Sequence, residues 1–350
     1  MKPIYDFNFQ VDEKLMNIIN DIDRLNEQWS IVGYYKDKSI KQQKELHNSS
    51  AIRSSGSSVR IEGSKIVQEK VEILLSHFDS ATLNDKDTQE TAGYFETLNT
   101  IINSYKNIQV SENSIKTLHK SLMKYCNIDE KHRGNYKTRR TAVEVVFPSG
   151  IKQTIFRTAE AGTTTQNSIK RLVSWYNKEN DFHPLIKNAT FVYEFLNVHP
   201  FQEGNGHLSR LLSTLFFLKD GHQWMQYVGF EHEIESRKNE YYIVLQNCQN
   251  QRPNENITDW IIFFLNIIRN VQSRLIRPLE QKGDGLSVTN REQSILSIIQ
   301  NNQGIQSPEI AKQIGISIPS VRRSLIVMQT KGLIKKYGSG SSTTYWTRQV

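Results

Sequence analysis

The chain has 350 residues, a formal net charge of +8, and a composition that is 37% hydrophobic and 23% charged. This length indicates two or three domains, and the composition excludes collagenous, disulfide-framework and globally disordered proteins. The N-terminus lacks the apolar stretch of a signal peptide, and the most apolar run, 260–268, is shorter than the ~20 residues that span a bilayer. We therefore expect a cytoplasmic protein without membrane contact, in which Cys126 and Cys248 are core thiols.

The charge is concentrated near the C-terminus. Residues 286–350 contain eight Lys or Arg and two acidic residues, so this segment holds +6 of the total of +8. A compact basic segment favours a polyanionic partner, although excess Lys and Arg can also serve solubility alone.

The first 280 residues predict mostly helix, because apolar residues recur at intervals of three and four in segments such as 91–104 and 169–176. The exception is 143–156, where β-branched and aromatic residues flank a Pro-Ser-Gly turn, the pattern of a β-hairpin. A lone hairpin must lie on the helices with at least one edge open. The hairpin either has no binding role or offers a strand that pairs with an extended peptide.

An apolar helix is expected at 186–198, and the run that follows it reads HPFQEGNGHLSR, from His199 to Arg210. Pro200 should end the first helix near His199, because the residue before a proline is disfavoured in the α region. The Gly204-Asn205-Gly206 turn exposes backbone N–H groups where a second helix begins. Such a turn is a nest for phosphate.

Three side chains beside this turn suit chemistry at a phosphate. Arg210 lies one turn further on and can bind the same anion with a bidentate fork. Glu203 offers a hard oxygen ligand suited to a partly hydrated Mg²⁺. His199 can act as a general base, since its ordinary pKa of about 6.5 is near working pH. Together with the glycine turn, these three side chains predict an in-line displacement at phosphorus.

The run resembles the Fic motif, H-x-F-x-D/E-G-N-G-R-x-x-R, at every specified position except one, because His207 stands where the family has its first arginine. Gly134-Asn135-Tyr136-Lys137 is similar to the family's G-x-Y/F-R, with lysine in place of arginine. The upstream hairpin corresponds to the family's flap, and Tyr241-Tyr242 falls in a later helix. The resemblance covers about 100–275.

A second segment, Ser58-Val59-Arg60-Ile61-Glu62-Gly63, is similar to the Fic inhibitory motif S/T-x-x-x-E-G/N. The resemblance implies that Ser58, Glu62 and Gly63 are inhibitory, and that the Glu62 carboxylate pairs with Arg210 in the place of the γ-phosphate. The alternative is a helix-capping sequence, because a serine followed by a glutamate four residues later is close to a capping box.

Fic proteins mostly transfer AMP from ATP to a Ser, Thr or Tyr hydroxyl of a protein. The resemblance implies that His199 deprotonates the hydroxyl and that Glu203 positions Mg²⁺. It also implies that nucleotide is bound by Gly204, Asn205, Gly206, His207 and Arg210. The flap would dock the target through Val143, Val145, Phe147, Ile151 and Ile155. An imidazole at 207 weakens nucleotide binding, changes the donor or faces away from the phosphates.

Residues 290–350 predict a winged helix-turn-helix: helices at 290–300, 307–315 and 318–330, then a basic two-stranded ribbon. The segment is similar to the winged-helix modules of bacterial regulators. Its partner is duplex DNA or a protein, and the residues expected to contact DNA are Arg322, Arg323, Lys335 and Lys336.

The expected fold is therefore mainly α: an N-terminal helical region at 1–99, a Fic-type helical bundle with its flap at 100–279, a polar linker at 280–289 and the winged helix. The expected activity is that of a self-inhibited protein adenylyltransferase with ATP as co-substrate. Transfer of UMP, phosphocholine or phosphate, and a DNA-binding regulator whose core only senses nucleotide, stay open as alternatives. A homodimer also stays open.

Overall fold

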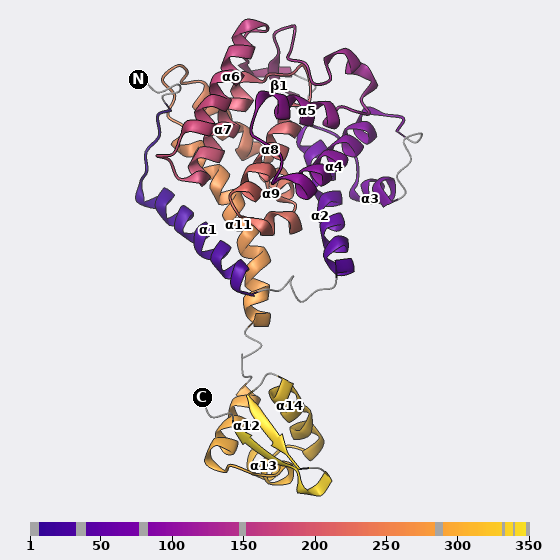
Figure 1. Cartoon of the computed structure of the whole chain (residues 1–350), viewed down its shortest axis with the longest axis vertical. Coiled ribbons are helices and arrows are strands. Elements are labelled where there is room, and N and C mark those ends of the chain that lie inside the picture. The colour runs from indigo at the N-terminus through magenta and orange to yellow at the C-terminus, as the bar shows by residue number, and fades with distance from the viewer. Residues whose placement is uncertain are drawn as a thin grey trace. The chain divides into compact units, whose positions relative to one another are not determined.

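A computed structural model describes residues 7–32, 40–76, 83–146, 152–283, 290–330, 333–338 and 340–347. They belong to two compact units, Met1–Leu275 and Ile276–Val350 (Figure 1). No helix within these described ranges combines the length and the apolar character needed to cross a bilayer. Each unit is built around an apolar core of its own.

The first unit is mainly helical, which confirms the predicted fold class. Among its described residues, the short 3-10 helices η2 (Asn127–His132) and η3 (Gln223–Tyr227) lie in connections between longer helices. Its described α-helices are α1 (Glu13–Val32), α2 (Ile40–Ile61), α3 (Gln68–Ser76), α4 (Lys86–Ser104), α5 (Glu112–Leu122), α6 (Thr163–Lys178), α7 (Pro184–Val198), α8 (Asn205–Lys219), α9 (Phe230–Ser236), α10 (Lys238–Gln249) and the part of α11 (Thr258–Gly283) up to Leu275.

Helices α7 and α8 pack against each other at the centre of this unit (Figure 1). Every residue from Asn188 to Val198 is buried, as expected for a helix that is apolar on most sides. The ring of Phe216 on α8 lies 4.7 Å from that of Tyr176 and 4.9 Å from that of Phe191, measured between centroids. Aromatic pairs at such spacings hold the two helices in one arrangement. The loop between α7 and α8 is therefore firmly placed.

The predicted hairpin is present as β1 (Ala142–Val146) and β2 (Lys152–Arg157), which pair antiparallel. Val143 pairs with Phe156, and Glu144 pairs with Thr154, so the register skips Ile155 at a bulge. Positions 147–151, and with them Phe147 and Ile151 of the expected docking strand, lie outside the described residues.

The second unit contains α12 (Asn290–Asn301), α13 (Ser307–Ile314), α14 (Ile318–Thr330), β3 (Ile334–Tyr337) and β4 (Thr344–Thr347). Gly315 ends α13 in the left-handed conformation, with φ +77°, and so allows the tight turn into α14. The antiparallel strands β3 and β4 form the wing. The linker prediction needs one correction. Because α11 continues to Gly283, residues 280–283 are helical; 284–289 lie outside the described residues.

Candidate active site

The connection from α7 to α8 carries the residues with catalytic potential. His199 follows the last residue of α7 and adopts a left-handed backbone conformation, with φ 51°. Within the described ranges it is the one non-glycine residue with a positive φ. Such a conformation is costly for a residue with a side chain, and it is found mostly where function requires it. The turn at His199 redirects the chain away from the α7 axis.

The imidazole of His199 is set up as a neutral base. Its Nδ1 donates a hydrogen bond to the carbonyl oxygen of Leu196 at 3.2 Å, so Nε2 is the nitrogen that can take a proton. Burial, with a smaller effect of the Lys137 ammonium, lowers the pKa of His199 to about 4. At neutral pH the ring is therefore unprotonated.

Lys137 holds the loop that follows α7 by hydrogen bonds on both sides of His199. Its buried Nζ donates to the carbonyl oxygen of Val198 at 2.9 Å and to Oγ1 of Thr158 at 2.8 Å, just after β2. Its backbone N–H donates to the carbonyl oxygen of Pro200 at 2.8 Å. Burial lowers the pKa of Lys137 to about 8. This lysine thus joins the base of the hairpin to both residues that flank His199.

The glycine turn opens α8 with its N–H groups exposed. Gly204 is in the left-handed region, with φ 77°, and the first-turn N–H groups that follow have no carbonyl partner within the helix. The side chain of Asn205 has a different role from the one expected. It accepts from the N–H of Phe201 and donates to its carbonyl oxygen, both at 2.9 Å. Asn205 therefore closes the loop with its side chain and offers only its backbone to a phosphate.

His119, which the sequence analysis did not single out, supports the same loop. Its Nδ1 accepts from the N–H of Gly134 at 2.9 Å, so its Nε2 donates to the carbonyl oxygen of Glu203 at 3.0 Å. Its ring stacks on Phe201 with centroids 3.8 Å apart. A histidine within a helical pattern gives no sign of such a contact, because the pairing spans 84 residues.

The end of α2 lies against α8. Nη2 of Arg210 donates to Oε1 of Glu62 at 2.8 Å and to the carbonyl oxygen of Ser58 at 3.1 Å, and Nε donates to Oγ of Ser58 at 3.0 Å. Although burial opposes both shifts, the pair lowers the pKa of Glu62 and raises that of Arg210. A β-carbon on Gly206 would collide with Oε1 of Glu62. The carboxylate of Glu62 therefore lies directly against the first turn of α8.

This geometry bears on the capping interpretation of the 58–63 segment. Ser58 lies in the last turn of α2 and is buried, and Glu62 and Gly63 follow the helix. A capping serine would stand at the start of a helix. The capping alternative is therefore wrong.

Nη1 of Arg210 is buried and has no hydrogen-bond partner in the described part of the chain, as expected of a cation with room for a further anion.

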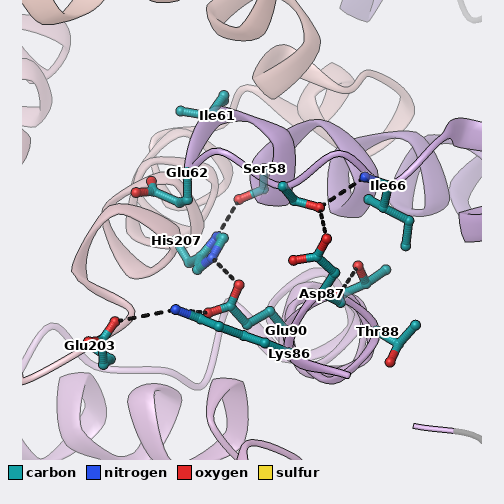
Figure 2. Close-up of polar contacts among 12 residues, drawn as sticks. Ser58, Ile61, Glu62, Ile66, Lys86, Asp87, Thr88, Glu90, Glu203 and His207 are labelled. Atoms are coloured by element: carbon teal, nitrogen blue, oxygen red, sulfur yellow. Dashed lines mark hydrogen bonds and ion pairs between the residues drawn. The ribbon is translucent and has the colours of Figure 1, made fainter. Parts of the chain in front are cut away.

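His207 faces protein groups on both sides of its ring, and the side chain is 2% exposed. Nδ1 lies 2.9 Å from Oγ of Ser58 (Figure 2). It also lies 3.1 Å from Nη2 of Arg210. Because a guanidinium can only donate, Nδ1 is the acceptor and the proton is on Nε2, which lies 3.7 Å from Oε2 of Glu90. Position 207 thus joins the 58–63 segment to α4.

Comparison with known proteins agrees with this architecture. Residues 109–217 match the model of the Fic/DOC family, and residues 289–335 match a winged helix-turn-helix DNA-binding model. The chain contains a Fic/DOC domain.

Solved Fic structures have the same fold. A Fic family protein from Desulfovibrio desulfuricans G20 is 20% identical with a TM-score of 0.64, and the match covers 98% of each chain. A Fic domain containing signaling protein from Bacteroides thetaiotaomicron VPI-5482 is 21% identical with a TM-score of 0.58, over 76% of this chain and 98% of that one. Fic-1 from C. elegans is 17% identical with a TM-score of 0.53, over 79% and 73%. These likenesses concern the fold.

A cleft of about 890 Å³ lies over the loop between α7 and α8. His199, Glu203, the Gly204–Gly206 turn, Glu62 and Lys86 all border it. It therefore brings together the predicted base, the predicted metal ligand, the glycine turn and the carboxylate of Glu62. The predicted flap residues Val143 and Val145 lie in β1, and Ile155 lies at the bulge of β2.

The cleft fits a magnesium ion that enters with its phosphates. Glu203 contributes a half-exposed carboxylate. The described residues include no group of three or more His, Cys, Asp or Glu side chains arranged to hold a metal ion. Mg²⁺ commonly binds through one or two carboxylates and completes its shell with phosphate oxygens and water. A single carboxylate beside an anion nest suits that mode.

Helix α10 contacts the 58–63 segment at the end of α2. The hydroxyl of Tyr242 donates to the carbonyl oxygen of Ile61 at 3.3 Å, and Nζ of Lys238 donates to that of Arg60 at 3.2 Å. The guanidinium of Arg60 also pairs with Glu235, near the end of α9. A lysine at the C-terminal end of a helix complements its dipole. The sequence placed Tyr241-Tyr242 in a later helix, but it did not indicate this contact with α2.

The four residues expected to contact DNA lie in the second unit. Arg322 and Arg323 are on α14, and Lys335 and Lys336 are on β3; all four are exposed. The wing and the third helix therefore both present positive charge to solvent.

Proposed function

We propose that this protein is a self-inhibited transferase that moves AMP from ATP to a hydroxyl group of a protein. The observation that carries the proposal is the Glu62 carboxylate, which lies on the N-terminal turn of α8 and is bonded to Arg210 at 2.8 Å. A helix N-terminus with a buried cation beside it is an anion site. The neutral base His199 borders the same cleft.

The chemical step follows from these positions. Nε2 of His199 takes the proton of the target hydroxyl, and the oxygen uses the freed electron pair to attack the α-phosphorus. The bond from this phosphorus to the bridging oxygen breaks, and pyrophosphate leaves with that electron pair. The N–H groups of the Gly204–Gly206 turn and the guanidinium of Arg210 hold the phosphates in line. A bound Mg²⁺ at Glu203 would neutralise phosphate charge.

Inhibition is a competition for one arginine. In the structure Arg210 is bonded to Glu62 and Ser58, so a γ-phosphate must displace the carboxylate to reach the guanidinium. Two anions cannot share the nest without strong repulsion. ATP that binds while Glu62 stays in place is therefore held in a pose unsuited to attack at the α-phosphorus.

The test is to incubate the protein with ATP labelled in its α-phosphate and, separately, in its γ-phosphate. Label on protein from the α-position alone supports AMP transfer. Label from the γ-position indicates phosphate transfer, and no label from either indicates a core that only senses nucleotide. His199→Ala is the matched control, since it removes the base and leaves the nest intact.

We further propose that the second unit binds duplex DNA. The support is the match to a DNA-binding winged-helix model together with the exposed cations on α14 and β3. A helix in the major groove and a basic wing along the phosphates are the contacts such modules make. The salt dependence of binding to duplex DNA tests this proposal.

A further inference from the structure

We propose that Lys86, at the start of α4, is a phosphate ligand of the nucleotide site and supplies the cation that the Fic motif lacks at position 207. The inference rests on the proposed function, because the phosphates are those of the nucleoside triphosphate. Lys86 lies 121 positions before His207 in the sequence, and only the fold brings the two residues to one cleft.

Position 207 itself offers no guanidinium to the cleft. Nδ1 of His207 faces Nη2 of Arg210 at 3.1 Å and Oγ of Ser58 at 2.9 Å, so this nitrogen is not available to a phosphate. Its one N–H is directed toward Glu90, at 3.7 Å between Nε2 and Oε2. An arginine at this position would be charged at any working pH. The site therefore lacks one cation relative to the motif.

Lys86 borders the same cleft. Nζ lies 3.6 Å from Oε1 of Glu90 and 3.8 Å from Oε2 of Glu203 (Figure 2). Both distances exceed those of a good hydrogen bond, so the ammonium is held loosely between the carboxylates. The side chain is 56% exposed and borders the cleft. It can turn toward an anion that enters beside Glu203.

The backbone of Lys86 is fixed while its side chain is free to turn. Asp85 is the N-cap of α4 and accepts from the N–H of Thr88 at 2.8 Å, in a reciprocal capping box. The adjacent Asp87 accepts from Oγ of Ser64, which follows the inhibitory segment. The start of α4 is thus bonded to the loop after Glu62. The backbone of Lys86 is therefore fixed relative to that loop.

The cleft carries more acidic than lysine side chains, which disfavours binding of a triphosphate. The lining of the cleft includes four carboxylates and two lysines. A triphosphate that approaches Glu203 and Glu90 meets like charge, which an ammonium between these two carboxylates offsets. The acids are Glu62, Asp87, Glu90 and Glu203, and the lysines are Lys65 and Lys86.

The experiment measures ATP binding by calorimetry in the full chain carrying Glu62→Gly, with Mg²⁺ and with EDTA. Lys86→Met should raise the Kd for ATP about tenfold in both buffers, the order expected for one charge-assisted contact. It should leave the Kd for adenosine unchanged, and Lys86→Arg should retain affinity for ATP. Lys70→Met is the matched control: Lys70 is also 56% exposed and pairs with Asp85, but it does not border the cleft.

An unchanged or tighter Kd for ATP in Lys86→Met would overturn the proposal, because Lys86 would then only shield the two carboxylates. So would an effect that disappears in EDTA, since Lys86 would then act through the metal site, or an equal loss of adenosine binding. Binding is measured apart from transfer. A Lys86-dependent Kd in a protein that transfers no label would support this inference and refute the transferase.

Discussion

His199 is the residue on which the proposed chemistry depends, and its neighbours determine its protonation. Its Nδ1–H is directed to Leu196, and burial with the nearby Lys137 ammonium lowers its pKa to about 4. The same shift has a consequence for folding. Between pH 6.5 and 4 the unfolded chain binds a proton that the folded chain does not, so acidification through this window lowers stability.

The rate of transfer should show no titration near pH 6.5. Since the free enzyme's base has a pKa of about 4, kcat/KM in the Glu62→Gly variant should be nearly equal at pH 5.5 and pH 7.5. Initial rates with labelled ATP measure this. Half-maximal activity at pH 6.5 would mean that the imidazole is as exposed to water as in a peptide.

His199→Ala should reduce transfer by about 10²–10⁴-fold, the usual cost of losing a general base. The Kd for ATP should stay within about twofold, because the nest and Arg210 carry the phosphates and this imidazole does not. Calorimetry and labelling on the same preparation separate the two effects. Transfer at the wild-type rate would remove His199 from the mechanism.

At single residues, the sequence indicated chemical type better than geometry. The predicted loop residues His199, Glu203 and Arg210 do border or lie beside one cleft. The roles of His119 and Lys86 could not be predicted, because both depend on contacts across more than 80 positions. His207 was recognised as a departure, but only the structure shows that its ring accepts from Arg210.

At the scale of elements, α2 is the part least evident from sequence. Its segment 54–58 reads Ser-Ser-Gly-Ser-Ser, residues that favour turns over helix interiors, yet all four serines are buried in the helix. Small side chains allow α2 to approach α4 and α9 closely. Packing overrides local propensity here, whereas the helices with regular apolar spacing and the hairpin were predictable.

Ser58→Ala should weaken the hold of α2 on α8. The change leaves Nε of Arg210 and Nδ1 of His207 each without one partner, at a cost of about 1–3 kcal/mol in unfolding free energy. Transfer should rise severalfold as the Glu62 end of the helix loosens. Denaturant unfolding and labelling measure the two effects.

Ser55→Ala is the control for this experiment. Ser55 is equally buried on α2, but its hydroxyl donates to the carbonyl oxygen of Ala51 within the same helix. Its removal should therefore leave transfer unchanged. If both alanine variants activate equally, the effect comes from general softening of α2 and the Ser58 contacts do not matter.

At the scale of the molecule, the winged helix at the C-terminus was predictable from the order of its elements and the position of its charge. The basic C-terminal segment forms a separate core around Ile299, Ile310, Val321 and Leu325, and it carries the wing. The exact boundary was not foreseen, because α11 extends a regular helical pattern into the polar stretch.

Binding of the full chain to duplex DNA should weaken with salt. Arg322→Ala with Arg323→Ala should reduce the slope of log K against log salt by about 0.9 for each phosphate that the variant no longer neutralises. Arg24→Ala on α1, an exposed arginine of the first unit, is the control and should leave the slope unchanged. If the intact chain fails to bind DNA at low salt, the winged helix docks a protein instead.

The central claim, a transferase restrained by its own Glu62, is tested most directly by α-phosphate labelling of Glu62→Gly beside wild type. The variant should label protein more strongly, because Arg210 and the α8 nest become available to the γ-phosphate. Its stability without nucleotide should fall by about 1–2 kcal/mol, since the side chain of Glu62 is 35% exposed and the pair only partly buried. Adding Arg210→Ala should abolish the gain. Labelling of Glu62→Gly no stronger than that of wild type, with His199 shown to be required, would contradict the account.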